Sequence, residues 1–297
     1  MYDIIIIGAG PAGLTSAIYA KRSNKNVLVL EANNYGGQIA IANVIDNYPA
    51  ISHISGYEFA TNLYNQVIDM GVEVKFEKAV EIKCNKIKEV VTDKNIYQTK
   101  SIIIAIGVRS RNLNIPGEKE LIGKGVSYCA TCDGMFYKGK EVAVVGAGNT
   151  AFEEANFLSD LCKKVYIIHR NENFKASQSL IKKVKAKNNI EFILNSNVVN
   201  INGKNKVESI DVISNDEKRT IDISGLFIAI GQIPENGNLT KNIKLDKNGY
   251  IKADKNLQTN IDGIYVAGDI RTKTLRQLVT ATSDGAIAAV NAIKSIK

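Results

Sequence analysis

The 297-residue sequence has no tryptophan, only four prolines, four cysteines and two histidines, and no long apolar run. A helix that crosses a bilayer needs about 20 consecutive apolar residues, so we expect no membrane segment. Four cysteines are too few for the disulfide framework of a secreted protein of this length. Asp3 stands where a signal peptide would carry positive charge. These absences together predict a cytoplasmic protein.

The net charge is +8, yet the basic residues form no long block and aromatic residues make up only 7% of the chain. Both features argue against binding to nucleic acid. Two interpretations of the charge remain open: lysines scattered over a solvated surface, or long-range attraction of an acidic partner. With 45% hydrophobic and 23% charged residues, the chain is not disordered, and its length predicts about two domains.

Two stretches of the chain repeat one pattern: an apolar strand, a Gly-x-Gly turn, an amphipathic helix and a second apolar strand. They cover residues 4–31 and 142–170. Each is a β-α-β unit of the kind that binds a dinucleotide. Each unit is followed by its own strand ending in Ala-Ile-Gly, at 102–107 and 227–231. The predicted fold is therefore α/β, with two Rossmann-like three-layer domains, the second inserted into the first.

The first copy has the residues that a dinucleotide site needs. Gly8 permits the tight turn, Gly10 lets a pyrophosphate approach the backbone, and Gly13 lets the helix pack closely on the strand. Glu31 ends the second strand, where a carboxylate accepts hydrogen bonds from ribose hydroxyls. This copy therefore predicts a site for a nucleotide whose ribose carries no phosphate.

The second copy has Gly146 and Gly148, with Ala151 in the third glycine position, and its second strand ends at His169 and Arg170. Because a cation at that place suits a 2′-phosphate better than a free hydroxyl, this copy favours NADPH. The alternative is a degenerate copy that is retained only as scaffold.

A third candidate cofactor contact lies near the C-terminus. Gly268 and Asp269 follow a short apolar strand, and Arg276 and Gln277 open a helix that is predicted to run to Ile293. A glycine and a carboxylate between a strand end and a helix N-terminus are suited to receive a cofactor.

Cys129 and Cys132 lie one helical turn apart, a spacing that allows an easily exchanged disulfide. Asp133, next to the pair, is suited to move a proton during exchange. A zinc site would need four ligands and normally a second Cys-x-x-Cys. Since Cys84 and Cys162 are single, we expect them to be unreactive packing residues and expect no metal. Buried structural thiols remain the alternative to redox activity.

Together, these motifs resemble the low-molecular-weight thioredoxin reductases over essentially the whole chain. The resemblance rests on Gly8-Ala-Gly-Pro-Ala-Gly13, Gly36-Gly37-Gln38, Asn47-Tyr48-Pro49, Cys129-Ala-Thr-Cys132-Asp133, Gly268-Asp269 and Arg276-Gln277. It implies bound FAD, a homodimer, thioredoxin as substrate, and a rotation of the inserted domain that exposes the dithiol alternately to flavin and thioredoxin. It also implies that Cys132 faces the flavin, Cys129 attacks thioredoxin, and Asp133 is the acid/base.

The resemblance assigns residues 1–112 and 238–297 to the FAD-binding domain and residues 113–237 to an inserted NAD(P)-type domain that carries the dithiol. The FAD-binding residues it implies are Gly8, Gly10, Pro11, Ala12, Gly13, Glu31, Gly37, Gln38, Asn47, Val80, Ala105, Gly107, Gly268, Asp269, Arg276 and Gln277. The candidate NADPH-binding residues are Gly146, Gly148, Asn149, Thr150, Arg170 and Lys175.

One departure from the family bears on the electron donor. The family binds the 2′-phosphate with His-Arg-Arg-x-x-x-Arg, whereas this chain has Asn171 and Lys175 at the last two basic positions, with Glu172 between them. Losing one charge-assisted contact costs about 1.5–3 kcal/mol, or roughly ten- to hundredfold in NADPH affinity. Some clostridial relatives accept electrons from reduced ferredoxin, an acidic protein that the +8 charge would attract, so both donors remain open. A flavin-bearing redox sensor or partner-binding protein with little turnover is the alternative to an enzyme.

Overall fold

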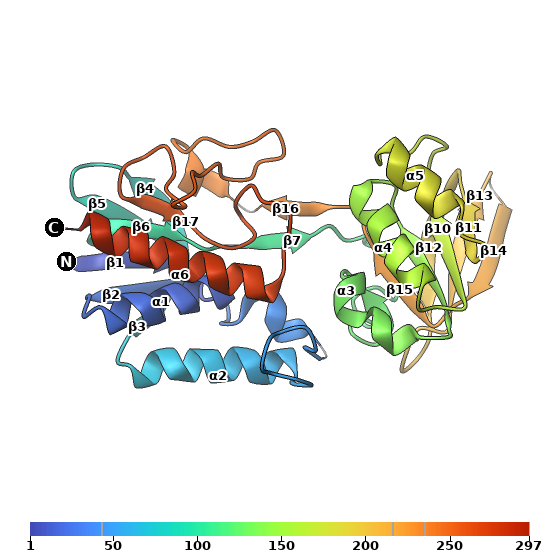
Figure 1. The fold of residues 1–297 in the computed structure, drawn as a ribbon, viewed down its shortest axis with the longest axis horizontal. Helices are drawn as coiled ribbons and strands as arrows, with labels where there is room; N and C mark the ends of the chain where they lie inside the picture. Colours follow the sequence, from blue (N-terminus) through green and yellow to red (C-terminus); the bar gives the residue numbers. More distant parts are fainter. Residues whose placement is uncertain (43, 216, 235, 297) are drawn as a thin grey trace. The chain divides into compact units, whose positions relative to one another are not determined.

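The computed structural model describes residues 1–42, 44–215, 217–234 and 236–296 (Figure 1). The chain divides into two compact units, one made of Met1–Arg109 and Ile233–Lys297 and the other of Ser110–Gln232. The second unit is thus an insertion, and the predicted α/β fold with two Rossmann-like units is confirmed. The assignment of FAD and NAD(P) binding to 1–112, 113–237 and 238–297 stays a prediction.

The first unit is built on a seven-stranded sheet in the order β3-β2-β1-β6-β5-β4, with β17 also paired to β6. Its strands are β1 (Tyr2–Ile7), β2 (Val27–Glu31), β3 (Glu73–Phe76), β4 (Ala79–Lys83), β5 (Lys88–Thr92), β6 (Ile96–Ile104) and β17 (Ile264–Val266). Strand β1 runs parallel to β2 and β6. The isoleucines of β1 and the end of β6 are buried, as expected for a parallel sheet that is covered on both faces.

The helices that accompany this sheet are α1 (Pro11–Arg22), α2 (Gly56–Asp69) and α6 (Leu278–Ser295), together with the short 3-10 helices η1 (Gly37–Ile41) and η3 (Gly237–Thr240). Helices α1 and α6 lie side by side (Figure 1). The two helices can approach closely because Gly285 has no side chain: a Cβ there would lie only 2.3 Å from the Ala12 carbonyl oxygen. The helix predicted to open at Arg276 and Gln277 begins at Leu278, with Gln277 as its cap.

The second unit has a parallel five-stranded sheet in the order β11-β10-β9-β15-β8 and an antiparallel sheet β12-β13-β14. The strands are β8 (Val126–Ser127), β9 (Glu141–Val145), β10 (Lys164–Ile168), β11 (Ile190–Ile193), β12 (Ser196–Asn202), β13 (Ser209–Ser214), β14 (Glu217–Asp222) and β15 (Gly225–Ile228). The helices are α3 (Ala130–Asp133), η2 (Gly134–Tyr137), α4 (Asn149–Ser159) and α5 (Gln178–Lys185). The short strands β7 (Val108–Ser110) and β16 (Gln232–Pro234) pair where the chain enters and leaves this unit.

Within the described residues, each helix is too short or too polar to cross a bilayer. The same residues contain no group of three or more His, Cys, Asp or Glu side chains that could hold a metal ion.

Candidate active site

The first Gly-x-Gly turn combines a tightly packed backbone with one open position. Gly8 has φ +110°, and a Cβ there would lie 2.4 Å from the Ala105 carbonyl oxygen. A Cβ at Gly13 would lie 1.9 Å from the Gly8 carbonyl oxygen, whereas a Cβ at Gly10 would meet no atom within 4 Å. The turn is therefore closed on the protein side and open at Gly10, which fits the pyrophosphate of FAD at the N-terminus of α1.

Glu31 ends β2 beside this turn. Its Oε2 accepts a hydrogen bond from the Ala9 amide at 2.7 Å, and its Oε1 accepts one from the Asn33 amide at 2.9 Å. A carboxylate has about four acceptor sites, so each oxygen retains one for a ribose hydroxyl. The position of Glu31 is therefore suited to the ribose of FAD.

Asp269 follows β17. Its Oδ1 is buried without a hydrogen-bond partner among the described residues, and the Lys273 ammonium lies 3.9 Å from it. Burial raises the pKa of this carboxyl. Its backbone is held in place, because Arg276 donates to the Asp269 carbonyl oxygen at 3.2 Å. Because the 3.9 Å separation from Lys273 is too long for a hydrogen bond, Oδ1 can still accept one, and a hydroxyl of FAD would supply the donor.

The other predicted FAD-binding residues fall into contacts made within the first unit. A Cβ placed on Gly37 would lie 3.6 Å from the Gly10 Cα, and a Cβ placed on Gly268 would lie 2.9 Å from the Ala12 Cβ. The Asn47 amide donates to the Gln277 side-chain oxygen at 3.1 Å. Pro11 begins α1, Gln38 lies in η1, and Gly107 follows β6. Val80 lies apart from these residues, 37% exposed on β4, the second strand beyond β6.

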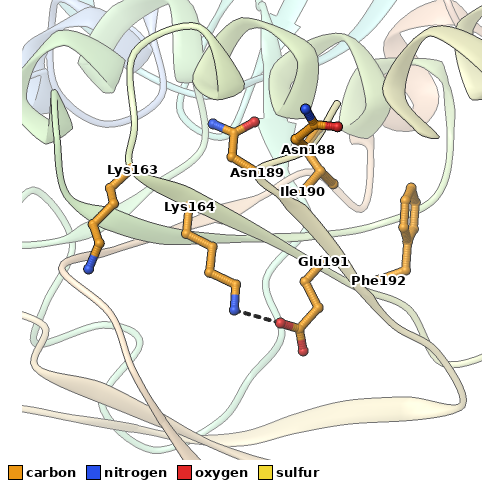
Figure 2. Close-up of a pocket in the computed structure, with 7 residues that line it drawn as sticks. All are labelled: Lys163, Lys164, Asn188, Asn189, Ile190, Glu191 and Phe192. Carbon is orange, nitrogen blue, oxygen red and sulfur yellow. Dashed lines mark ion pairs between the residues drawn. The ribbon is translucent and has the colours of Figure 1, made fainter. Parts of the chain in front are cut away.

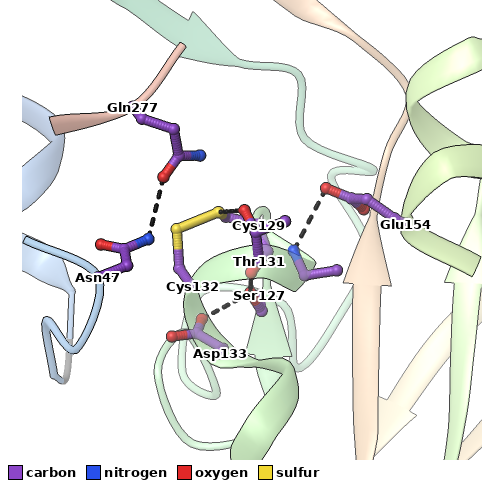
Figure 3. Close-up of a disulfide and its surroundings, with 9 residues drawn as sticks. Asn47, Ser127, Cys129, Thr131, Cys132, Asp133, Glu154 and Gln277 are labelled. Atoms are coloured by element: carbon purple, nitrogen blue, oxygen red, sulfur yellow. Dashed lines mark hydrogen bonds between the residues drawn. A yellow bond between two sulfur atoms is a disulfide. The ribbon is translucent and has the colours of Figure 1, made fainter. Parts of the chain in front are cut away.

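In the second unit, Cys129 and Cys132 form a disulfide with their Cα atoms 5.3 Å apart (Figure 3). Cys129 precedes the single turn α3, and Cys132 lies inside it. The Thr131 hydroxyl lies 3.4 Å from the Cys129 sulfur. The single cysteines differ from each other: Cys162 is buried, as expected of a packing residue, whereas Cys84 is exposed after β4.

Asp133 lies directly after Cys132 and is largely buried. The Ser127 hydroxyl donates to its Oδ2 at 2.6 Å, and the Cys129 amide donates to the Ser127 oxygen at 3.1 Å. The other carboxylate oxygen, Oδ1, is buried with no partner in the described part of the chain. Burial raises the pKa of Asp133. The carboxyl next to the disulfide therefore holds a proton more readily than an exposed aspartate does.

Glu154 is a second carboxyl near the disulfide that was not among the residues predicted from the sequence. Glu154 lies on α4, and its Oε1 accepts a hydrogen bond from the Ala130 amide at 3.3 Å (Figure 3). Burial raises the pKa of Glu154 to about 7. The available signal was an acidic side chain in a helix with a mostly apolar inward face. The sequence alone does not show that α3 packs against α4.

The second Gly-x-Gly turn has the same construction as the first. Gly146 has φ +144°, a Cβ there would lie 2.4 Å from the Ala229 carbonyl oxygen, and a Cβ at Gly148 would meet nothing within 4 Å. The Asn149 side-chain oxygen accepts a hydrogen bond from the Ser177 amide at 2.8 Å, and Thr150 is exposed. The turn is therefore intact and open to a phosphate.

Arg170 directly follows His169, and the Lys175 amide donates to the Ala147 carbonyl oxygen of the second turn at 2.8 Å. Burial lowers the pKa of the His169 imidazole, and the positive charges of Arg170 and Lys175 lower it further. Both side chains are exposed. The Glu172 carboxylate accepts a hydrogen bond from the Asn195 side-chain amide at 2.9 Å. This bond holds a negative charge on the same loop as Arg170 and Lys175.

A hollow of about 580 Å³ lies elsewhere in the second unit, lined by Lys163, Lys164, Asn188, Asn189, Ile190, Glu191 and Phe192 (Figure 2). Lys164 and Glu191 form an ion pair of 2.7 Å across it. Both the hollow and this pair lie where β10 and β11 begin. Because open α/β sheets bind ligands at the carboxyl ends of their strands, the hollow is distinct from the nucleotide site.

Two dinucleotide turns and one exchangeable disulfide in the same chain are the defining parts of a flavoprotein disulfide oxidoreductase. The family described as pyridine nucleotide-disulphide oxidoreductase matches residues 2–285. The chain is 43% identical to a thioredoxin reductase of Ureaplasma parvum, over 98% of this chain and 96% of that protein. It belongs to this family and, within it, to the low-molecular-weight thioredoxin reductases. The family implies FAD as cofactor.

Solved structures agree. The thioredoxin reductase of Streptococcus pyogenes matches with a TM-score of 0.95 and 38% identity, over 99% of this chain and 98% of that one. A ferredoxin-flavin thioredoxin reductase of Clostridium acetobutylicum matches with a TM-score of 0.54 and 32% identity, over 99% and 97% of the two chains.

Proposed function

We propose that this protein reduces the disulfide of thioredoxin through Cys129 and Cys132. The observation that carries the proposal is the disulfide between these residues, bordered by the buried carboxyl of Asp133. FAD, when bound, supplies the pair of electrons that opens this disulfide. The chain would hold it with the open turn at Gly10 for the pyrophosphate, Glu31 for the ribose and Asp269 for a further hydroxyl.

The exchange proceeds in two steps that conserve electrons. The Cys129 thiolate attacks one sulfur of the thioredoxin disulfide, forming a mixed disulfide and releasing the other thioredoxin sulfur as a thiolate. The Cys132 thiolate then attacks the Cys129 sulfur, which re-forms the Cys129–Cys132 disulfide and releases reduced thioredoxin. Asp133 supplies and accepts the protons of the sulfurs, because its raised pKa lets it carry a proton.

Serine variants test the dithiol. Cys132→Ser is expected to abolish thioredoxin reduction while the protein stays yellow with bound flavin. Cys129→Ser should also abolish turnover. Reduction of thioredoxin by either variant at the wild-type rate, or no turnover of the wild type with any donor, would contradict the proposal.

The electron donor is either NADPH or reduced ferredoxin, and separate observations support each. The intact turn at Gly146 and Gly148 supports a nucleotide. Ferredoxin is supported by Asn171 at a position where the family has a 2′-phosphate-binding arginine, by the +8 charge, and by the structural likeness to a ferredoxin-flavin thioredoxin reductase. Anaerobic flavin bleaching with NADPH, NADH and reduced ferredoxin, offered separately, decides between them. Rapid bleaching by micromolar NADPH would rule against ferredoxin.

We also propose that the protein is a homodimer. The outer side of α1 and α6 exposes Tyr19 (44%), Ile287 (40%) and Val290 (36%) around a hollow that they help to line. Apolar side chains gathered on one helical face are typical of an interface between subunits. Sedimentation equilibrium should give twice the chain mass, and Ile287→Glu should shift the protein toward the monomer. A monomeric wild type would contradict this proposal.

A further inference from the structure

The backbone amides at the start of the Cys129–Cys132 segment donate hydrogen bonds to two side chains, one at the end of β8 and one on α4. The Cys129 amide donates to the Ser127 hydroxyl, and the next amide, that of Ala130, donates to Glu154 Oε1 (Figure 3). Ala130 is fully buried, so water does not compete for this amide. The Cys129 amide is therefore connected to Asp133 through the Ser127 hydroxyl, and the Ala130 amide is bonded directly to Glu154.

Glu154 differs from an ordinary helix-surface glutamate. Its Oε2 is buried and has no hydrogen-bond partner among the residues that the structure describes. Desolvation raises the pKa of this carboxyl to about 7, the Ala130 amide opposes that rise, and the neighbouring Glu153 adds to it. Leaving a buried acceptor unpaired destabilises the folded state, and an apolar residue at this position would avoid that cost.

We propose that Glu154 is a positioning residue of thiol–disulfide exchange, which fixes the backbone joining the two sulfurs through the Ala130 amide and disfavours the thiolate of Cys129 by its own negative charge. The first effect follows from the hydrogen bond. The second follows because Glu154 accepts from the amide of the residue next to Cys129, and a negative charge in the neighbourhood of a thiol disfavours its ionisation. The inference rests on the proposed function of the dithiol and adds a residue to it.

The charge effect is tested on a single exposed thiol. In a Cys84→Ser, Cys132→Ser holoenzyme, Cys129 is the accessible cysteine, because Cys162 is buried. The rate of alkylation by iodoacetamide, followed from pH 5 to 10, gives the pKa of the Cys129 thiol. Glu154→Gln should lower that pKa and raise the alkylation rate at pH 7 about three- to tenfold. Glu153→Gln removes an exposed charge from the preceding position of the same helix. Because Glu153 acts on the site only through its small effect on Glu154, this variant should not raise the rate.

The positioning effect is tested by turnover. In the wild-type dithiol, Glu154→Ala should lower the turnover number for thioredoxin about tenfold, since the Ala130 amide loses its acceptor. Glu154→Gln should recover most of that loss, because its side-chain carbonyl still accepts the hydrogen bond. Should Glu154→Ala fail to retain FAD, the alkylation experiment on Glu154→Gln and Glu154→Asp carries the test alone.

Two results would overturn the inference: alkylation of Cys129 in Glu154→Gln at the rate found in Glu153→Gln, or full turnover by Glu154→Ala. Failure of the proposed function looks different. In that case the enzyme with both cysteines would not reduce thioredoxin with any donor, whereas the alkylation rates, which need no turnover, would still report on Glu154.

Discussion

Ser127 and Asp133 are joined by a hydrogen bond of 2.6 Å in which the serine hydroxyl donates to the carboxylate. The same hydroxyl oxygen accepts from the Cys129 amide, and because a hydroxyl has a single proton, donation to Asp133 at 2.6 Å competes with the longer contact to the Cys129 carbonyl oxygen at 3.4 Å. The bond therefore fixes the carboxylate beside the disulfide with its other oxygen, Oδ1, unpaired. An acceptor held next to two reacting sulfurs is suited to take up and return a proton.

Asp133→Asn should separate catalysis from stability. The turnover number should fall about hundredfold, since the amide cannot carry the proton. The raised pKa means that burial opposes ionisation of Asp133 in the folded state. The ionisable side chain therefore lowers the free energy of unfolding as the pH rises from its pKa in the unfolded chain, about 3.9, through its higher pKa in the folded protein. The midpoint of thermal unfolding at pH 7 should therefore be higher in the variant than in the wild type.

The same experiment has an internal control, because the stability difference between Asp133→Asn and the wild type should vanish below about pH 3, where both side chains are neutral. Thermal unfolding at pH 3 and pH 7 measures it. A variant that is less stable than the wild type at pH 7, with unchanged turnover, would show that Asp133 is a structural residue.

Gly10→Ala and Gly13→Ala should fail in different ways. A Cβ at Gly13 would lie 1.9 Å from the Gly8 carbonyl oxygen, so this variant should unfold more easily, by about 1–3 kcal/mol, even without flavin. A Cβ at Gly10 meets nothing in the protein, so this apoprotein should stay stable and lose FAD affinity. Denaturant unfolding of the apoprotein and titration of flavin fluorescence measure the two effects. Equal FAD affinity in Gly10→Ala and the wild type would exclude the open side of the turn as the pyrophosphate site.

Glu31→Ala should weaken FAD binding about ten- to hundredfold, because hydrogen bonds to a charged group contribute about 1.5–3 kcal/mol. Part of the effect would come through the Ala9 and Asn33 amides that Glu31 holds. Glu31→Gln, which keeps one acceptor oxygen, should retain more affinity than Glu31→Ala. The release of flavin fluorescence on dilution gives both constants, and wild-type affinity in Glu31→Ala would contradict the assignment.

Asn171→Arg should restore a charge at the 2′-phosphate position and raise NADPH affinity about tenfold. Asn188→Arg is the matched control, since it adds the same charge at the hollow of Figure 2, where β11 begins. Anaerobic bleaching of the flavin against NADPH concentration measures the change. Bleaching by reduced ferredoxin should be the same in both variants. An equal gain in NADPH affinity from Asn188→Arg would mean that net charge, rather than the arginine at position 171, governs that affinity.

The residue pattern alone was enough to predict both dinucleotide turns, the insertion of the second unit into the first and the identity of the dithiol. Each of these features depends on neighbours close in the chain: Gly8, Gly10 and Gly13 shape one turn, and Cys129 and Cys132 lie one helical turn apart. Local backbone geometry is enough to specify them. The fold class was therefore predictable, and the structure confirmed it.

The partners of the polar groups depend on packing between distant segments. Glu154 reaches the Ala130 amide because α4 packs against α3, and the buried Oδ1 of Asp269 has the Lys273 ammonium at 3.9 Å but no hydrogen bond among the described residues. The tertiary structure likewise left Cys84 exposed where a buried packing residue was expected. Burial and hydrogen-bond partners depend on segments far apart in sequence, so pattern and spacing alone do not reveal which carboxyls hold protons.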